Sequence, residues 1–288
     1  MQIQSVLIDA LQQELDLPII SFQTISGGDI NQAFRLETPT QSLFLKYNQY
    51  PQGAEMLRTE KAGLEHLAAK AVIPVPKPIA QGTRGSYHFL VLEDWSGQQS
   101  SPSFWPVFGQ ALAALHQQTQ ASFGLFENNF IAKLPQSNRL HTSWSSFYWE
   151  ERLAPLVQQG FEQGLLDSRA VGQLEQLGKR LSEHFPDRAP SLLHGDLWSG
   201  NFMVAPNGQA GLIDPAIYYG HREMDLAMTR LFGGFQGVFY QAYQEAFPLD
   251  KGWENRVLLC QLYPLLVHLL LFGRSYRSAV EEVIKAYH

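Results

Sequence analysis

The sequence predicts an α+β protein in two parts, a small N-terminal part built on strands and a larger C-terminal part that is mainly helical. Short apolar runs separated by turn residues fill the first 94 of the 288 residues. Apolar residues at helical spacing dominate the remainder. A polar segment, 94–103, rich in Ser, Gly and Gln, separates the two patterns. We therefore expect one domain over 1–94 and a second over 95–288.

The N-terminal part is expected to form a strand meander with helices. The expected elements are helices over 1–17 and 53–70 and strands over 19–25, 33–38, 42–47 and 87–93. Three prolines at alternate positions, Pro74, Pro76 and Pro78, keep the chain between the second helix and the last strand extended, because proline disfavours helix. A glycine pair, Gly27-Gly28, lies at the first turn.

The C-terminal part is expected to be helical apart from one hairpin. The expected helices cover 104–118, 143–159, 170–184, 223–231, 238–245 and, in pieces, 253–287. The apolar runs Phe202-Met203-Val204 and Gly211-Leu212-Ile213 are joined by Pro206-Asn207-Gly208, which is a turn sequence. This segment predicts a β-hairpin inside the helical part.

Charge and composition exclude several classes of protein. Lys and Arg number 21 against 27 Asp and Glu, so the formal charge of −6 supplies no basic field for nucleic acid or an anionic membrane. The single cysteine, Cys260, excludes an intrachain disulfide or a cysteine-built metal site. The longest apolar stretch, 262–272, is about half the length of a bilayer span. No Lys or Arg precedes Arg35, so we expect no basic leader and a cytoplasmic globular protein.

The segment that carries chemistry runs from His194 to Pro215. Asp196 and Asn201 are five residues apart in a glycine-containing loop, so their side chains can converge on one point. A hairpin returns the chain to its start, so Asp214, which follows it, is expected beside Asn201. Two carboxylates and an amide oxygen suit Mg²⁺, which takes few protein ligands together with phosphate oxygens. The alternative is a loop in which the Asp and Asn only cap turns.

This spacing resembles the catalytic core of protein-kinase-like phosphotransferases, in which Asp, Asn five residues later and an Asp after a hairpin act together. The resemblance implies a two-lobed protein-kinase-like fold with ATP between the lobes. It implies that Asp196 is the base that accepts the substrate hydroxyl proton, and that Asn201 and Asp214 hold Mg²⁺.

Other kinase features occur in the expected order along the N-terminal part. The backbone of Gly27-Gly28 lies between two strands, where it can cover nucleotide phosphates. Lys46 lies in the third strand, where the kinase lysine contacts the α- and β-phosphates. Glu60 lies on the apolar face of the next helix and supplies the ion-pair partner of that lysine. Glu93-Asp94-Trp95 ends the last strand, where the backbone of a hinge bonds the adenine edge.

Three segments resemble one family, the fructosamine/ketosamine-3-kinases of the aminoglycoside and choline kinase-like group. They are HGDLWSGN (194–201), DPA (214–216) and YGHREMDLAM (219–228). The resemblance covers nearly the whole chain. It implies ATP-dependent phosphorylation of the C3 hydroxyl of a ketosamine, a sugar joined to an amine by glycation. The 3-phosphate then breaks down and releases the amine, so the expected role is deglycation of a small-molecule ketosamine or another glycated amine.

Two residues near the loop are assigned further roles. Trp198 either packs on the apolar face of a sugar ring or is buried against the hairpin. Asp225 is expected to bond the backbone of the catalytic loop and hold its shape. Gly195 stands where protein kinases have Arg, and eight residues separate Asp214 from Glu223. That spacing leaves no room for a long activation loop, so the sequence favours a constitutive kinase of small substrates.

Other substrates and a non-catalytic role remain as alternatives. The acceptor could be an aminoglycoside, choline or a free sugar. A cationic substrate such as choline predicts a cage of aromatic and acidic side chains, which 144–151 could supply with Trp144, Phe147, Tyr148, Trp149, Glu150 and Glu151. A pseudokinase that only binds nucleotide is disfavoured because Lys46, Asp196, Asn201 and Asp214 are all present.

Overall fold

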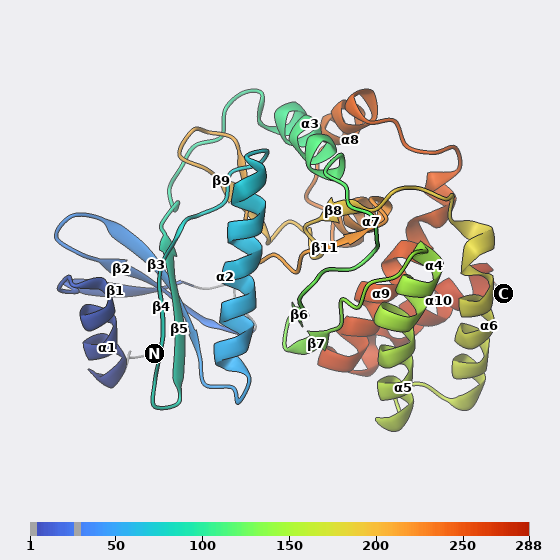
Figure 1. Ribbon diagram of the computed structural model, residues 1–288, viewed down its shortest axis with the longest axis horizontal. Helices are drawn as coiled ribbons and strands as arrows, with labels where there is room; N and C mark the ends of the chain where they lie inside the picture. Colours follow the sequence, from blue (N-terminus) through green and yellow to red (C-terminus); the bar gives the residue numbers. More distant parts are fainter. Residues whose placement is uncertain (1–4, 26–29, 288) are drawn as a thin grey trace. The chain divides into compact units, whose positions relative to one another are not determined.

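The computed structural model describes residues 5–25 and 30–287 of the chain. It divides into two compact units (Figure 1). The N-unit consists of 1–108 and 200–215, and the C-unit consists of 109–199 and 216–288. The N-unit thus extends beyond residue 94 and takes in the hairpin segment. Nucleotide binding by 1–94 and catalysis by 95–288 remain predictions, and Gly27-Gly28 lies outside the described residues.

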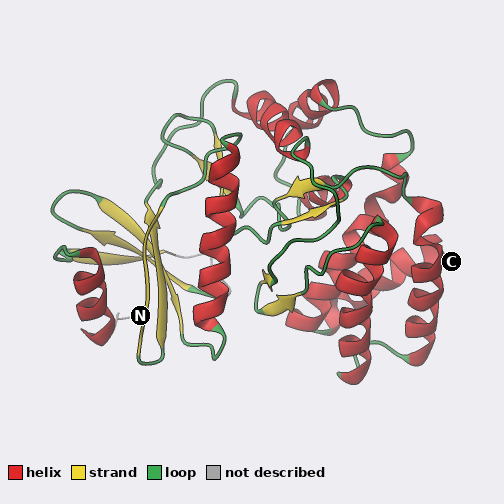
Figure 2. Ribbon diagram, in the orientation of Figure 1, coloured by secondary structure: helices red, strands yellow, loops and turns green. Residues whose placement is uncertain are grey.

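The N-unit is built on one antiparallel sheet of five strands in the order β1-β2-β3-β5-β4 (Figure 2). The strands are β1 (Ser21–Ile25), β2 (Gln32–Glu37), β3 (Ser42–Asn48), β4 (Pro78–Arg84) and β5 (Tyr87–Glu93). Four of them match the strands predicted from the sequence. The sequence did not predict β4, because the proline-rich chain that leads into it was expected only to be extended. Pro78 is tolerated because it is the first residue of an edge strand.

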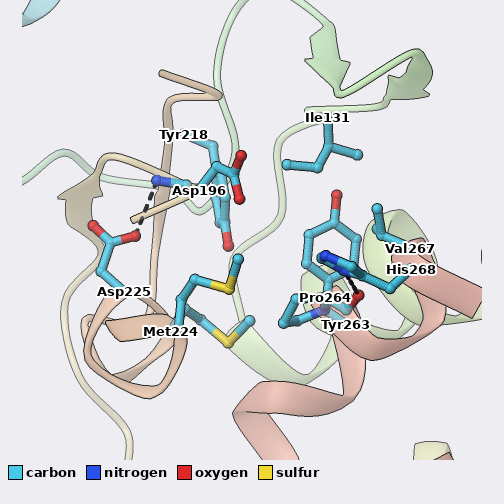
Figure 3. Close-up of a pocket in the computed structure, with 11 residues that line it drawn as sticks. Ile131, Asp196, Tyr218, Met224, Asp225, Tyr263, Pro264, Val267 and His268 are labelled. Atoms are coloured by element: carbon cyan, nitrogen blue, oxygen red, sulfur yellow. Dashed lines mark hydrogen bonds between the residues drawn. The ribbon is translucent and has the colours of Figure 1, made fainter. Parts of the chain in front are cut away.

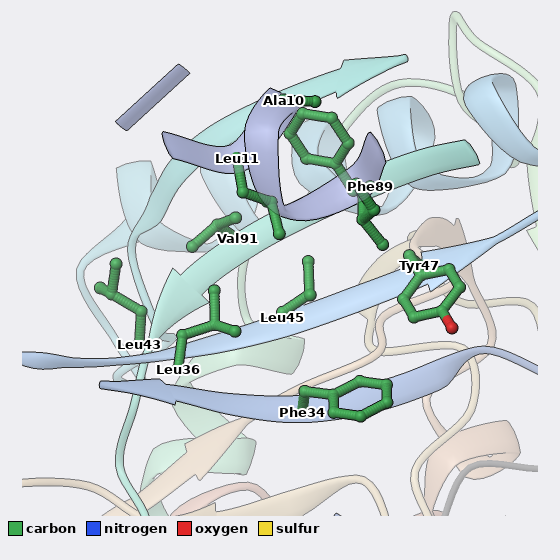
Figure 4. Close-up of a cluster of buried hydrophobic side chains, with 10 residues drawn as sticks. Ala10, Leu11, Phe34, Leu36, Leu43, Leu45, Tyr47, Phe89 and Val91 are labelled. Carbon is green, nitrogen blue, oxygen red and sulfur yellow. The ribbon is translucent and has the colours of Figure 1, made fainter. Parts of the chain in front are cut away.

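Two helices cover opposite faces of this sheet, α1 (Ser5–Leu15) and α2 (Gly53–Lys70). Successive side chains of a strand point to opposite faces. On β3 the alternate residues Leu43, Leu45 and Tyr47 join the core beneath α1 (Figure 4). The intervening Phe44 packs with α2 residues on the other face. This alternation places Lys46 on the α2 side of the sheet.

The predicted hairpin is present in the N-unit as β9 (Phe202–Val204) and β10 (Ala210–Leu212). These strands pair antiparallel, with Leu212 opposite Phe202. The backbone N–H of Leu212 donates to the carbonyl of Pro74 at 2.9 Å, which attaches the hairpin to the segment before β4. A Cβ at Gly211 would lie 2.3 Å from the ring of Trp95, so the hairpin and the end of β5 are packed without spare room.

The C-unit is mainly helical and contains two short strand pairs (Figure 2). Its helices are α3 (Phe104–His116, which begins in the N-unit), α4 (Trp144–Phe147), η1 (Tyr148–Leu153), α5 (Ala154–Glu162), α6 (Ser168–His184), α7 (Glu223–Leu231), α8 (Gly237–Ala246), α9 (Trp253–Phe272), η2 (Arg274–Tyr276) and α10 (Arg277–Tyr287). Its strands are β6 (Asn129–Ile131), β7 (Leu134–Gln136), β8 (Ser191–Leu193) and β11 (Tyr218–Gly220). The helix predicted over 143–159 is interrupted by the π-helix η1.

The helix α9 forms the centre of the C-unit and packs on α5, α7 and α10. By length and composition alone it is apolar enough to cross a membrane. However, 56% of its apolar window is buried inside the protein, and a buried core helix meets the same criterion. The helix therefore gives only weak support for a membrane span, and the predicted absence of a membrane partner stays a prediction.

Replacing Gly211 with alanine tests the packing of the hairpin. We expect Gly211→Ala to destabilise the protein by about 1–3 kcal/mol, because the new methyl group must displace the Trp95 ring. The matched control is Gly172→Ala in α6, where a Cβ meets nothing within 4 Å. The control should be neutral or stabilising, because glycine costs about 1 kcal/mol in a helix interior. Equal thermal midpoints (Tm) for the two variants would contradict the close packing.

Candidate active site

A buried lysine ammonium lies between two carboxylates in the N-unit. Lys46 is buried on β3, and its Nζ lies 2.9 Å from Oε1 of Glu60 on α2. The same Nζ contacts Oδ1 of Asp214, the residue two positions after β10. The ion pair between Lys46 and Glu60 predicted from the sequence is therefore confirmed. A cation removed from water needs such partners, because a buried unpaired charge is strongly unfavourable.

The hairpin brings Asp214 beside Asn201, as the sequence predicted. The backbone N–H of Ile213 donates to the carbonyl of Asn201 at 3.1 Å. Asp214 has a φ of 54°, in the left-handed region that few residues other than glycine adopt and that Asp tolerates better than most. Such backbone conformations cost energy and cluster at functional sites. The Asp214 side chain is 41% exposed, so its carboxylate reaches solvent as well as Lys46.

The donor atoms at this point suit a magnesium ion. Asn201 offers an amide oxygen and Asp214 a carboxylate oxygen, which are the hard ligands Mg²⁺ prefers. Two protein ligands leave most coordination positions to water and phosphate oxygens, as is usual for Mg²⁺ at nucleotide sites. The residues present therefore fit the ion that the sequence predicted, and their role as its ligands stays a prediction.

The side chains of the predicted hinge are engaged within the N-unit. The Asp94 carboxylate lies 2.7 Å from Nε of Arg35. Glu93 accepts a hydrogen bond from the backbone N–H of Lys77 at 3.1 Å, and Trp95 is buried. These contacts hold the end of β5 in place. A nucleotide contact at this segment would therefore use the main chain, which is how the sequence predicted it.

In the C-unit, the paired strands β8 and β11 position the loop after β8, which we call the catalytic loop because it carries the predicted base Asp196. Leu193 at the end of β8 pairs with Tyr218 at the start of β11. Beyond them, the backbone N–H of Ala216 donates to the carbonyl of His194 at 2.9 Å. Gly195 has a φ of +86°, and a Cβ there would lie 2.1 Å from the Ala216 carbonyl oxygen. The loop therefore requires glycine at a position where protein kinases have Arg.

Asp225 holds this loop through its backbone, as predicted. Its Oδ2 accepts a hydrogen bond from the N–H of His194 at 2.7 Å, and its Oδ1 accepts one from the N–H of Gly195 at 2.9 Å. Asp225 is fully buried. Burial by itself raises the pKa of the carboxyl, but the hydrogen bonds and charge from His116, with help from the Gly195 N–H, outweigh it and lower the pKa. The residue is therefore a fixed anion within the C-unit.

A histidine that the sequence did not assign to the site supports Asp225. Nε2 of His116 lies 3.2 Å from Oδ2 of Asp225, and its Nδ1 lies 2.8 Å from the hydroxyl of Tyr243. Both ring nitrogens of His116, the last residue of α3, therefore have partners. Its link to the catalytic loop gave no sequence signal, because Asp225 and Tyr243 lie more than a hundred residues away.

Asp196 borders a small pocket in the C-unit (Figure 3). Its backbone N–H lies 3.2 Å from Nδ1 of His194, which helps to set the turn of the loop. Apolar side chains make up much of the pocket wall, including Ile131, Met224, Met228 and Val267. The cavity measures about 20 Å³, which is room for about one water molecule. A sugar ring does not fit inside, so an acceptor hydroxyl would approach Asp196 at the mouth.

Trp198, two residues after Asp196, contacts another aromatic side chain of the C-unit. Its ring meets that of Phe232 edge to face, with centroids 6.0 Å apart. Trp198 is partly buried and Phe232 is exposed. The predicted role of Trp198 as a platform for a sugar ring stays a prediction.

The aromatic and acidic side chains of 144–151 do not form an open cage. Trp144, Phe147 and Tyr148 are buried in the core of the C-unit. Glu151 is also buried and is bonded to Arg139 and His141. The structure therefore gives no support to a cation-binding cage here. The run of aromatic and acidic residues suggested a cage, because aromatic residues of a core and of a cage cannot be distinguished in a sequence.

Comparison with known proteins identifies the family. The family model described as fructosamine kinase matches residues 1–288. This chain belongs to the fructosamine kinase family. A probable ketoamine kinase of Lactiplantibacillus plantarum is 42% identical, with 92% of this chain and 93% of the relative covered. The chloroplastic protein-ribulosamine 3-kinase of Arabidopsis thaliana is 35% identical, with coverage of 93% and 83%.

Solved structures agree with this assignment. A crystal structure described as "putative fructosamine-3-kinase" from Thermobifida fusca superposes with a TM-score of 0.88 at 31% identity, covering 99% of each chain. A spectinomycin phosphotransferase solved with ADP and spectinomycin has a TM-score of 0.63 at 17% identity, covering 100% of this chain and 94% of that one, and shares the fold. The predicted protein-kinase-like α+β fold is confirmed, and this family member is an ATP-dependent phosphotransferase.

Asp225→Asn tests the support of the catalytic loop. Asparagine offers one acceptor oxygen, so one of the two backbone N–H groups loses its partner, which costs about 1–3 kcal/mol. The pKa of Asp225 is lower in the folded protein than its ordinary value of 3.8. The stabilisation by the carboxylate is therefore fully present above about pH 5 and is lost as pH falls through the folded pKa.

We expect Asp225→Asn to lower Tm by a constant amount between pH 5 and 8. The difference in Tm between the variant and the wild type should become smaller in more acidic solution. Asp9→Asn, on α1 in the N-unit, is the control and should show no such gap. A gap that widened on acidification would contradict the role of the ionised carboxylate.

Proposed function

We propose that this protein transfers the γ-phosphoryl group of ATP to the C3 hydroxyl of a ketosamine. The observation that carries the proposal is the buried Lys46 between Glu60 and Asp214, because a lysine ammonium held by carboxylates is suited to bind the phosphates of a nucleoside triphosphate. The names of the ketoamine kinase and ribulosamine 3-kinase relatives support a ketosamine as the acceptor. The products would be ADP and a ketosamine 3-phosphate, whose breakdown releases the amine.

The nucleotide end of the reaction would be handled by residues of the N-unit. Lys46 would contact the α- and β-phosphates, and Glu60 would keep the ammonium in place. Asn201 and Asp214 would hold Mg²⁺, which neutralises charge on the phosphate oxygens. The present contact between Lys46 and Asp214 would give way to phosphate and metal contacts when the nucleotide binds. Gly27-Gly28 would cover the phosphates with their backbone, and the main chain of Glu93-Asp94-Trp95 would meet the adenine.

The acceptor would be handled by residues of the C-unit. Asp196 would accept a hydrogen bond from the sugar hydroxyl and take its proton as the hydroxyl oxygen attacks the γ-phosphorus. The P–O bond to ADP breaks as the new P–O bond forms. Asp225 takes no part in proton transfer and only holds the backbone on which Asp196 is carried. Trp198 would pack against the sugar.

We also propose that the partners are small molecules and that the reaction occurs in the cytoplasm. The net charge of −6 does not favour nucleic acid or an anionic membrane. Choline is disfavoured as an acceptor because Trp144, Phe147 and Tyr148, three of the aromatic residues of the candidate cage, are buried in the core. An aminoglycoside or a free sugar stays the alternative that the experiment below separates.

The proposed reaction is tested by ADP release with ATP and Mg²⁺ on a panel of acceptors. The panel contains a fructose-amine, a ribulose-amine, free fructose, choline and an aminoglycoside. We expect turnover on the ketosamines alone. Asp196→Asn should lower kcat by about 10²–10⁴-fold, because a positioned base is lost, while the Kd for ATP stays the same. Turnover confined to another acceptor, or an unchanged kcat in the variant, would overturn the proposal.

Glu60→Gln tests whether Glu60 positions Lys46 for nucleotide binding. Lys46 would lose a charged partner 2.9 Å away, and a charge-assisted hydrogen bond contributes about 1.5–3 kcal/mol. We expect the KM for ATP to rise about tenfold or more. The matched control is Glu65→Gln on the same helix, because Glu65 pairs with Lys61 on the surface. An equal effect of the two variants on KM would show that Glu60 does not position Lys46.

A further inference from the structure

A row of aromatic side chains in the C-unit leads away from the pocket at Asp196. The ring of His268 lies 5.0 Å from that of Phe232, 5.4 Å from that of Phe272 and 5.0 Å from that of Tyr276, measured between centroids. Phe232 in turn contacts Trp198. The row therefore joins the loop after Asp196 to the end of α9 and to η2. We call Trp198, Phe232, His268, Phe272 and Tyr276 the aromatic row.

The aromatic row leaves apolar surface open to solvent. Phe272 is 49% exposed and Phe232 is 40% exposed. Phe126 and Phe161 are exposed as well, but neither contacts another aromatic ring in the described part of the chain. Single exposed apolar residues are ordinary, whereas neighbouring ones mark a binding surface.

The aromatic row begins at the wall of the pocket that Asp196 borders. His268 lines that pocket together with Asp196 (Figure 3). Nδ1 of His268 donates to the carbonyl of Pro264, one turn earlier on α9, at 2.7 Å. This bond fixes the plane of the ring between the pocket and the outer rings. A molecule with one end at Asp196 can therefore continue along Phe232, Phe272 and Tyr276.

The chemistry of a ketosamine matches this arrangement. Its amine is attached at C1, two carbons from the C3 hydroxyl, so the group that the amine carries begins close to the reacting oxygen. With the hydroxyl at Asp196, that group meets the pocket wall first and the aromatic row next. The nitrogen is a secondary amine that is protonated at neutral pH, and aromatic faces attract cations. An apolar group on the nitrogen would cover exposed ring surface, which is favourable.

We infer that the outer rings of the aromatic row, Phe232, Phe272 and Tyr276, are the binding site for the amine-borne group of the ketosamine and that they select aromatic or long apolar groups. The inference rests on the proposed function, because it needs a ketosamine with its hydroxyl at Asp196. It goes further by assigning to Phe232, Phe272 and Tyr276 the choice among amines. Substrates that share one sugar and differ only in the amine should then differ in KM.

The experiment compares two fructose-amines, one made from benzylamine and one from methylamine, at saturating ATP. We expect wild-type kcat/KM to favour the benzylamine compound by about tenfold. Phe272→Ala should raise the KM for that compound by about three- to tenfold, the size of one aromatic contact. It should leave kcat unchanged, and the KM for the methylamine compound should rise less, because that compound keeps the charged nitrogen but has no ring to cover. The control is Phe161→Ala on α5, since Phe161 is 46% exposed and lies outside the aromatic row.

A second variant distinguishes the loss of a ring contact from a general loss of folding. Tyr276→Phe keeps the ring and removes only the hydroxyl, so it should preserve the preference for the benzylamine compound. Equal losses on both compounds in Phe272→Ala would overturn the inference, because they would indicate a general structural defect. Turnover of both compounds without preference in the wild type would overturn the inference and leave the proposed function standing. Turnover of neither compound would overturn both.

Discussion

The buried ammonium of Lys46 is the constraint on which the N-unit depends. A strand interior offers no water to solvate a cation, so carboxylates must be brought to it. Glu60 comes from α2 and Asp214 comes from the end of a hairpin far along the chain. The alternation of β3 sends its apolar residues to α1 and Lys46 toward α2. One buried charge thereby links β3, α2 and the end of the hairpin.

The C-unit also contains a buried charge, but one of the opposite sign. Asp225 is a buried anion, and its partners are the backbone N–H groups of the catalytic loop together with His116. These donors come from α3 and from the loop after β8, which are far apart in the sequence. The loop backbone is bent at Gly195, where no side chain fits against the Ala216 carbonyl. The anion and the glycine together define one loop shape, so Asp196 is carried on a rigid support.

The sequence predicted the parts of this protein that depend on local patterns or on charge pairing. The helix 53–70 has the predicted bounds, because its apolar stripe is long and regular. The pairing of Lys46 with Glu60 followed from a carboxylate on an apolar face. The hairpin at 202–212 followed from its turn sequence. In each case the deciding interaction either joins residues that are close in the sequence or is required because a buried charge needs a partner.

The features that the sequence could not predict depend on distant contacts or on very short elements. The three-residue strands β6, β7, β8 and β11 are too short to show a period. The π-helix inside 143–159 spans six residues, which is too short to show a period of its own. The link from His116 to Asp225 joins residues 109 positions apart. The supposed cage around Trp144 failed for the same reason, since only the folded core shows which aromatic rings are covered.

The division of the N-unit into two chain segments has a consequence for synthesis. Residues 1–108 emerge from the ribosome before 200–215, so the five-stranded sheet can form before the hairpin that completes the N-unit is made. Until then Lys46 lacks the carboxylate of Asp214, and Trp95 lacks the surface that Gly211 provides. Non-local contacts of this kind slow folding, because distant segments must meet before they stabilise each other. The nascent N-terminal segment therefore exposes these unpartnered groups, and exposed groups of this kind favour aggregation, until 200–215 are made.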